Sequence, residues 1–233
     1  MATSDFVLVH GGFAGGWCWQ RVAETMRAAG HRVHTPTLPG LAERAHELSP
    51  DLDLESHFDA VVDLVLTEDL SDFVLCGHSY GGMVITGAAE RLAPRIRALV
   101  YLDGVLPEPG ASLWDNLSED QRRYFASVTE GLGVAAGRPG PGMVDPANAD
   151  WVFSQSTPHP RSTFHGRVPE TTHRDAIPTK VHVRAKGYPS AMIDTSHARA
   201  RGWGWTCLEL LLAHNVMIDA PDEVCQILLA AAG

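Results

Sequence analysis

The sequence of 233 residues has few cysteines, and none of them lies at a spacing typical of a metal or redox site. A C-x-x-C pair, which would indicate a zinc knuckle or a thioredoxin-like motif, is absent from its four cysteines, Cys18, Cys76, Cys207 and Cys225. Because disulfide frameworks belong mainly to oxidising compartments, this sparse cysteine content favours a reduced, cytoplasmic location.

Long apolar runs are also absent. No stretch approaches the roughly 20 apolar residues that a membrane-spanning helix needs. The N-terminus runs from Met1 to Asp5 directly into an apolar segment, without the basic start and long apolar core of a signal peptide. We therefore expect no membrane partner.

Positive charge is scarce, since 18 Lys and Arg face 28 Asp and Glu and give a formal net charge of −10 with no basic block. Such a surface repels phosphate backbones, so we expect no nucleic-acid partner. No pair among the 12 histidines has convincing metal-ligand spacing, and we expect no metal and no cofactor. The expected partner is a small-molecule substrate, and the sequence leaves a homodimer open.

What the sequence does contain is a regular alternation of strands and helices. Short β-rich runs bounded by turn residues predict strands, and apolar residues at helical spacing predict helices. The strands are expected at residues 6–10, 31–38, 73–76, 96–102, 180–185 and 205–212, and the helices at 17–29, 54–66, 82–92, 189–201 and 221–232. This alternation implies an α/β fold with a mostly parallel sheet of about six strands and helices on both faces.

The alternation stops between residues 105 and 178. This stretch is rich in proline, has no strong strand, and contains one or two helices near 114–129 and a Gly/Pro-rich loop at 131–146. We expect a core made of residues 1–104 and 179–233, interrupted by a lid insertion at 105–178.

The sharpest local signal is Gly77-His78-Ser79-Tyr80-Gly81-Gly82, which matches G-x-S-x-G. An expected buried strand leads into it and an expected helix leads out, which is the setting of a nucleophile elbow. Such a tight turn lifts the serine to the carboxyl ends of the strands, where open α/β sheets bind ligands. We interpret Ser79 as the nucleophile. The alternative is a glycine-rich turn with an incidental serine.

A second glycine-rich loop, from His10 to Gly16, follows the first expected strand. It lacks both the P-loop pattern and the G-x-G-x-x-G spacing, so a phosphate or dinucleotide cradle is disfavoured. A His-Gly-Gly turn after a strand is suited to presenting a backbone N–H to an oxyanion. We assign that N–H to Gly12 and a second one to Tyr80. A merely tight turn is the alternative.

A serine nucleophile needs a base within hydrogen-bond reach, and His214 has the best position among the histidines. It follows the last expected strand and precedes the last helix, and in this architecture that loop returns to the elbow in the chain order serine, acid, histidine. A surface-loop histidine is the alternative. His159, His165 and His173 fall in the insertion and are interpreted as surface residues or substrate contacts.

The acid that would orient His214 is expected just after the strand ending near Ala185, but residues 184–189 hold no carboxylate. Asp103 is favoured instead, because it ends the 96–102 strand and all strands of a parallel sheet end at one edge. Its carboxylate should then lie about 2.6–3.2 Å from a ring nitrogen of His214. Asp194, or no acid at all, are the alternatives.

Together these segments resemble the α/β-hydrolase group of plant methylesterases and hydroxynitrile lyases, with their bacterial relatives. The resemblance rests on FVLVHGGFAGGWCW at 6–19, GHSYGGM at 77–83, YLDGVLPEPG at 101–110 and HNVMIDAPDEV at 214–224. It implies an α/β-hydrolase fold with Ser79 as nucleophile, His214 as base, and Gly12 and Tyr80 as oxyanion donors.

The chain departs from this group at three positions. The usual acid position is not acidic. The lyases carry a lysine directly after the catalytic histidine, where this chain has Asn215. They also carry a hydroxyl residue after the histidine that corresponds to His10, where this chain has Gly11. Cyanohydrin cleavage is therefore disfavoured, since Asn215 brings no positive charge to a departing cyanide.

The leading hypothesis is a serine hydrolase that cleaves a small hydrophobic or aromatic ester or thioester through an acyl-enzyme. Its substrate is expected to contact aromatic side chains, namely Phe13, Trp114, Phe125 and Trp151, although core packing would explain them equally well. Two alternatives use the same fold differently. A non-hydrolytic lyase, cyclase or C–C bond enzyme of a natural-product pathway would form no acyl-enzyme, and a ligand-binding protein would need neither Ser79 nor His214.

Overall fold

The computed structural model describes residues 3–233 and contains a central sheet of six parallel strands. The first two residues of the N-terminal stretch considered above for a signal peptide lie outside it. The strand order is β2-β1-β3-β4-β8-β9. Their bounds are β1 Asp5–Val9, β2 Arg32–His34, β3 Phe73–His78, β4 Ile96–Leu102, β8 Thr179–Ala185 and β9 Thr206–Leu210. The predicted parallel sheet is thus confirmed.

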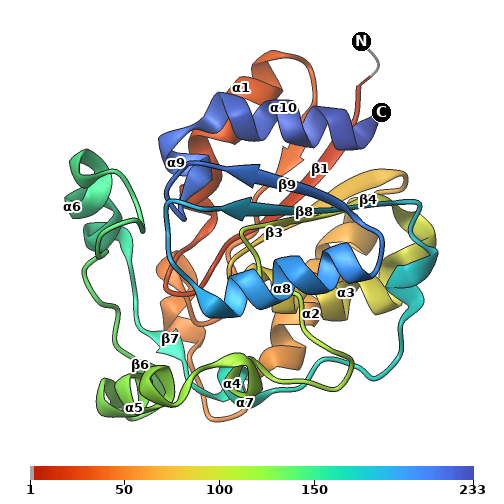
Figure 1. Ribbon diagram of the computed structural model, residues 1–233. Helices are drawn as coiled ribbons and strands as arrows, with labels where there is room; N and C mark the ends of the chain where they lie inside the picture. The colour runs from red at the N-terminus through yellow and green to blue at the C-terminus, as the bar shows by residue number, and fades with distance from the viewer. Residues whose placement is uncertain (1–2) are drawn as a thin grey trace.

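Helices cover both faces of this sheet (Figure 1), as predicted. Helices α1 Gln20–Ala28 and α10 Pro221–Ala232 lie together on one face. Helices α2 Leu54–Thr67, α3 Gly81–Leu92 and α8 Ala191–Gly202 cover the other. Because the central strands are buried on both sides, they read in the sequence as continuous apolar runs and not as alternating ones.

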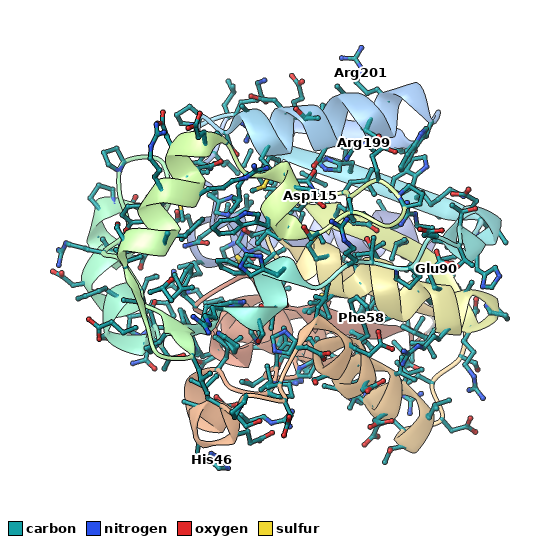
Figure 2. All side chains as sticks on the ribbon, turned by 90° about the horizontal axis from the view of Figure 1, so that it is seen from below. His46, Phe58, Glu90, Asp115, Arg199 and Arg201 are labelled. Carbon is teal, nitrogen blue, oxygen red and sulfur yellow. The ribbon has the colours of Figure 1, made fainter. Side chains whose placement is uncertain are left out.

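Close packing of α2 on α3 depends on one aromatic side chain. Phe58 of α2 is fully buried and lies against Gly87 of α3, where its ring leaves no room for a Cβ. Figure 2 shows Phe58 between these two helices, in contrast to His46 and Arg201, which project from the rim. The glycine therefore brings α2 close to the helix that follows the proposed elbow.

Two predicted elements are shorter than expected. The 31–38 strand is ordered as a strand only over Arg32–His34, because it is an edge strand and Pro36 removes a backbone donor just beyond it. The 17–29 helix begins as a 3₁₀ turn over Gly16–Trp19 before α1 starts. Further short elements are the 3₁₀ turns Ala42–Glu47 and Ala93–Arg95 and the helix α9 Val216–Asp219.

The segment between β4 and β8 contributes no strand to the six-stranded sheet in the described part of the chain. It forms the short helices α4 Leu113–Asn116, α5 Glu119–Ser127, α6 Pro146–Gln155 and α7 Ser162–His165, a 3₁₀ turn at His173–Ala176, and a small antiparallel sheet of β5 Thr129–Glu130, β6 Gly133–Val134 and β7 His159–Pro160. In Figure 1 this segment lies at the side toward which the arrows of the parallel strands point. It therefore stands beside the sheet edge at which ligands bind in open α/β folds.

None of the helices within residues 3–233 has the length and apolar character that crossing a bilayer requires.

Candidate active site

Ser79 occupies a tight turn between β3 and α3, as the sequence predicts. Its φ angle is +52°, a left-handed conformation that costs free energy for a residue with a side chain. Two neighbouring glycines permit this turn. A Cβ on Gly77 would lie 2.5 Å from the carbonyl oxygen of Gly81, and a Cβ on Gly81 would lie 2.7 Å from the carbonyl oxygens at the end of β1. The small residues therefore let α3 approach the strands and hold the serine at their carboxyl ends.

His214 and Asp103 come together at the same edge. His214 lies in the loop between β9 and α9, and its Nδ1 is 2.6 Å from Oδ2 of Asp103. This distance lies at the lower end of the range of about 2.6–3.2 Å expected from the sequence. Both side chains are buried. The histidine loop is also tied to the insertion between β4 and β8, called the lid below for brevity, since the backbone N–H of His214 donates to the carbonyl of Gly142 at 2.8 Å.

The second carboxylate oxygen of Asp103 is held by two donors from the end of β8. It accepts from the backbone N–H of Ala185 at 2.8 Å and from the guanidinium of Arg184 at 3.0 Å. Burial by itself would raise the pKa of Asp103. The hydrogen bond and charge of His214, the Ala185 N–H and the Arg184 guanidinium outweigh burial, and the pKa lies below its ordinary value. Asp103 is therefore an ionised acceptor for the histidine.

Asp194, the alternative acid, has different partners. Its carboxylate pairs with Arg184 at 2.8 Å and with Lys186 at 3.4 Å, and half of its side chain is exposed. The structure brings Asp103, and not Asp194, to His214. Arg184 thus bridges the two carboxylates from the end of β8, the strand after which the sequence led us to expect an acid.

Ser79 and His214 line the same cavity, which has a volume of about 430 Å³. Since Asp103 accepts a hydrogen bond, His214 carries its proton on Nδ1 when neutral, and Nε2 is left as an acceptor. Within residues 3–233, Nε2 has no hydrogen-bond partner. The ring is thus in the tautomer that can take a proton from a serine hydroxyl.

Gly12 and Tyr80 also line this cavity, and neither backbone N–H has a protein acceptor in the described part of the chain. The orientation of the Gly12 N–H follows from His10. The N–H of Leu38 donates to Nε2 of His10 at 3.0 Å, so Nδ1 carries the proton and donates to the carbonyl of Gly11 at 2.8 Å. In a trans peptide the N–H points opposite to the C=O. His10 therefore turns the Gly12 N–H away from itself.

Burial keeps His10 in this neutral donor–acceptor form. It lowers the pKa of His10 to about 4, although the hydrogen bond to the Gly11 carbonyl and the charge of Glu43 act in the opposite direction. Above that pH the ring can accept from Leu38 on one nitrogen and donate to Gly11 from the other.

The predicted substrate contacts divide into two groups. Phe13 and Phe125 line the cavity and pack with Phe164, at ring-centroid distances of 6.4 and 5.3 Å from it respectively. Trp114 and Trp151 do not line it.

Helical geometry explains where the two tryptophans lie, because successive helical residues point about 100° apart. On α4, Leu113 faces the cavity, and Trp114 packs instead against His165, in a tilted arrangement with a centroid distance of 4.5 Å. On α6, Val152 faces the cavity, and Trp151 packs edge-on against Trp17 and is 37% exposed. The expectation that these tryptophans line the site is corrected accordingly.

One histidine of the insertion also differs from expectation. His159 was expected at the surface or against substrate, but it is fully buried and its Nδ1 lies 3.3 Å from the backbone nitrogen of Phe13. No sequence signal identifies this role of His159, because the contact depends on how the lid packs on the His10–Gly16 loop. His165 and His173 are exposed.

No group of three or more His, Cys, Asp or Glu side chains suited to a metal ion is found among residues 3–233.

Comparison with known proteins gives one consistent result. The family model described as "Alpha/beta hydrolase family" matches residues 6–227. The "Carbendazim hydrolyzing esterase" of Nocardioides sp. (strain SG-4G) is 37% identical over 239 residues, which cover 97% of this chain and 99% of that protein. Salicylic acid-binding protein 2 of Nicotiana tabacum is 37% identical over 107 residues, covering 44% of this chain and 40% of its own length.

Solved structures show the same fold. An extracellular alpha/beta-hydrolase from a Paenibacillus species, described as sharing structural and functional homology with the tobacco protein, superposes with a TM-score of 0.85. The match covers 98% of both chains at 22% sequence identity.

Proposed function

The chain belongs to the alpha/beta hydrolase family and is an enzyme of the ester-hydrolysing kind, and we propose that it cleaves a small ester or thioester through an acyl-enzyme on Ser79. The observation that carries this proposal is the buried hydrogen bond from His214 Nδ1 to Asp103 at 2.6 Å. It leaves the other ring nitrogen as a base in the cavity that Ser79 lines.

The reaction proceeds in two halves. As the Ser79 oxygen attacks the carbonyl carbon of the substrate, its proton passes to Nε2 of His214. The carbonyl oxygen becomes an oxyanion and accepts the N–H groups of Gly12 and Tyr80. When the tetrahedral intermediate collapses, the imidazolium gives its proton to the leaving alcohol or thiol. A water molecule then repeats the sequence on the acyl-enzyme, releases the acid and restores Ser79.

Asp103 contributes through its charge and its geometry. The imidazolium that forms in each half-reaction is buried beside the ionised carboxylate, which stabilises it. The carboxylate cannot rotate away, because the donors from Ala185 and Arg184 hold its other oxygen. His214 is thereby kept in one orientation through the cycle.

The cavity favours an apolar substrate. Its walls are mostly aliphatic and aromatic, with contributions from Phe13, Phe125, Phe164, Leu113 and Met192. Such a lining stabilises a hydrophobic or aromatic group by burial and leaves orientation to a few polar atoms near Ser79. The name of the Nocardioides relative supports including carbendazim among the substrates to be tested.

The proposal predicts that Ser79→Ala abolishes hydrolysis of short-chain p-nitrophenyl esters, because no nucleophile remains. Loss of such a residue commonly lowers kcat by many powers of ten, on the order of 10⁶-fold. Initial rates of p-nitrophenol release measure this. Ser71→Ala is the matched control, since Ser71 is exposed at the opposite end of β3 and should leave the rate unchanged. Near wild-type turnover by Ser79→Ala would contradict the acyl-enzyme route and favour a non-hydrolytic use of the cavity.

A further inference from the structure

The lid makes two hydrogen bonds with the backbone of the His10–Gly16 loop, both at Phe13. The N–H of Phe13 donates to Nδ1 of His159 at 3.3 Å, and the carbonyl of Phe13 accepts from the N–H of Thr157 at 3.0 Å. Phe13 has a φ of +66°, a left-handed conformation that a bulky residue rarely adopts. Such a conformation persists only where surrounding contacts hold it. Here the contacts come from the lid.

The hydrogen bonds around His159 define its tautomer. Since Nδ1 accepts from Phe13, the proton lies on Nε2, which donates to the hydroxyl of Thr163 at 2.8 Å. That hydroxyl in turn donates to the carbonyl of Pro160 at 2.9 Å. Every polar hydrogen in this series of three hydrogen bonds therefore has an acceptor, which fixes the His159 ring in place.

His159 also lies against both residues that supply the proposed oxyanion donors. Its ring centroid is 4.6 Å from that of Tyr80, and a Cβ built on Gly12 would be 3.6 Å from Nδ1. The ring thus fills the space between Gly12 and the side chain of Tyr80. His10 orients the peptide before Gly12, and His159 orients the peptide after it.

We propose that His159 is a positioning residue through which the lid completes the oxyanion hole. By accepting the Phe13 N–H, it holds the turn that brings the Gly12 N–H toward the Tyr80 N–H. The inference rests on the proposed function, because it assumes that these two groups stabilise an oxyanion. The lid, and not only the core, then shapes the site that binds the transition state.

Protonation of His159 would destroy this contact, since an imidazolium has no acceptor nitrogen. Burial, together with the nearby His57 and His10, holds the pKa of His159 well below its ordinary value. The acceptor is therefore present throughout the neutral pH range.

Two substitutions separate positioning from packing. His159→Asn places an amide oxygen near the position of Nδ1 and keeps an acceptor for Phe13, but loses the contact with Thr163. His159→Gln places its amide near the position of Nε2 and keeps the Thr163 contact, but leaves the Phe13 N–H without an acceptor. His165→Gln is the control, because His165 is an exposed histidine in the same lid.

Three measurements are made on each variant: kcat and KM for a p-nitrophenyl ester, the inhibition constant of an aryl trifluoromethyl ketone, and the Tm. The Ser79 oxygen adds to the ketone carbon and gives its proton to His214, so the adduct carries the oxyanion. We expect His159→Gln to lower kcat by about 10- to 100-fold with little change in KM. Its affinity for the ketone should fall by the same factor as kcat/KM.

His159→Asn should keep kcat within a few-fold of wild type even if its Tm falls, and His165→Gln should match wild type throughout. Two results would overturn the inference. In one, His159→Gln has wild-type kcat. In the other, both His159 variants lose activity equally and in proportion to Tm. Failure of the proposed function is recognised separately, as an absence of ester hydrolysis and of ketone inhibition in the wild-type protein, and it would overturn the inference as well.

Discussion

At the scale of single residues, the carboxylate that binds His214 follows β4, and not β8, where the sequence led us to expect the acid. β4 and β8 are neighbours in the sheet, so the residue after β4 and the residue after β8 emerge side by side. Asp103, in a left-handed turn with φ of +42°, reaches the position that an acid at the end of β8 would otherwise serve. Arg184 then occupies the end of β8 and binds the carboxylate.

Asp103→Asn should lower kcat by roughly 10³- to 10⁴-fold while leaving the fold intact. The donors from Ala185 and Arg184 require an oxygen at the Oδ1 position. The amide nitrogen must therefore face His214 and donate to its Nδ1, which forces the proton onto Nε2. In that tautomer the histidine cannot accept the proton of Ser79. Steady-state kinetics on a p-nitrophenyl ester and a circular dichroism spectrum test both parts.

Asp194→Asn is the matched control, and its activity should stay within a few-fold of wild type. Asp194 contacts Arg184 and Lys186, and it has no contact with His214. An active Asp103→Asn together with an inactive Asp194→Asn would show that the acid lies on the other segment.

Some of these residues could be predicted from the sequence and others could not. Ser79 and His214 could be placed because local motifs and the order of strands determine where they emerge. The Asp103 contact with His214 followed from the single edge of a parallel sheet. His159 could not be found, since its partner Phe13 is 146 residues away and the contact depends on lid packing that no local pattern encodes.

At the scale of elements, the core strands were predictable because each is a short apolar run bounded by turn residues. The secondary structure of the lid was harder to predict. Its strands β5, β6 and β7 have only two residues each, which is too short for any periodicity. Helix α6 did carry a start signal, since Asp145 caps it through the N–H of Ala147 and Pro146 takes the first helical position.

At the scale of the whole molecule, several buried histidines are held neutral in the folded protein. Burial lowers the pKa of His10 and His182 to about 4 and that of His57 and His78 to about 3, and it places the pKa of His159 well below its ordinary value. In the unfolded chain these groups have a pKa of about 6.5. Between these values the unfolded state binds more protons than the folded state.

The free energy of unfolding should therefore be fully developed above about pH 6.5 and should fall as the pH drops toward the folded-state pKa values near 4 and 3. One such group contributes a slope of about 1.4 kcal/mol per pH unit, and with several the slope between pH 6 and 5 should be steeper than that. Urea unfolding at a series of pH values measures it. A free energy of unfolding that stays constant from pH 7 to 5 would show that these histidines are protonated in the folded state.

The central claim is that His214 and Asp103 activate Ser79 as a nucleophile, and covalent trapping tests it most directly. The protein is incubated with a fluorophosphonate, whose phosphorus the Ser79 oxygen attacks with loss of fluoride, and the modified residue is located by peptide mass spectrometry. We predict one phosphonyl group per chain on Ser79, none on Ser79→Ala, and greatly slowed labelling of His214→Ala. An unlabelled wild-type protein, or a label on any residue other than Ser79, would contradict the account.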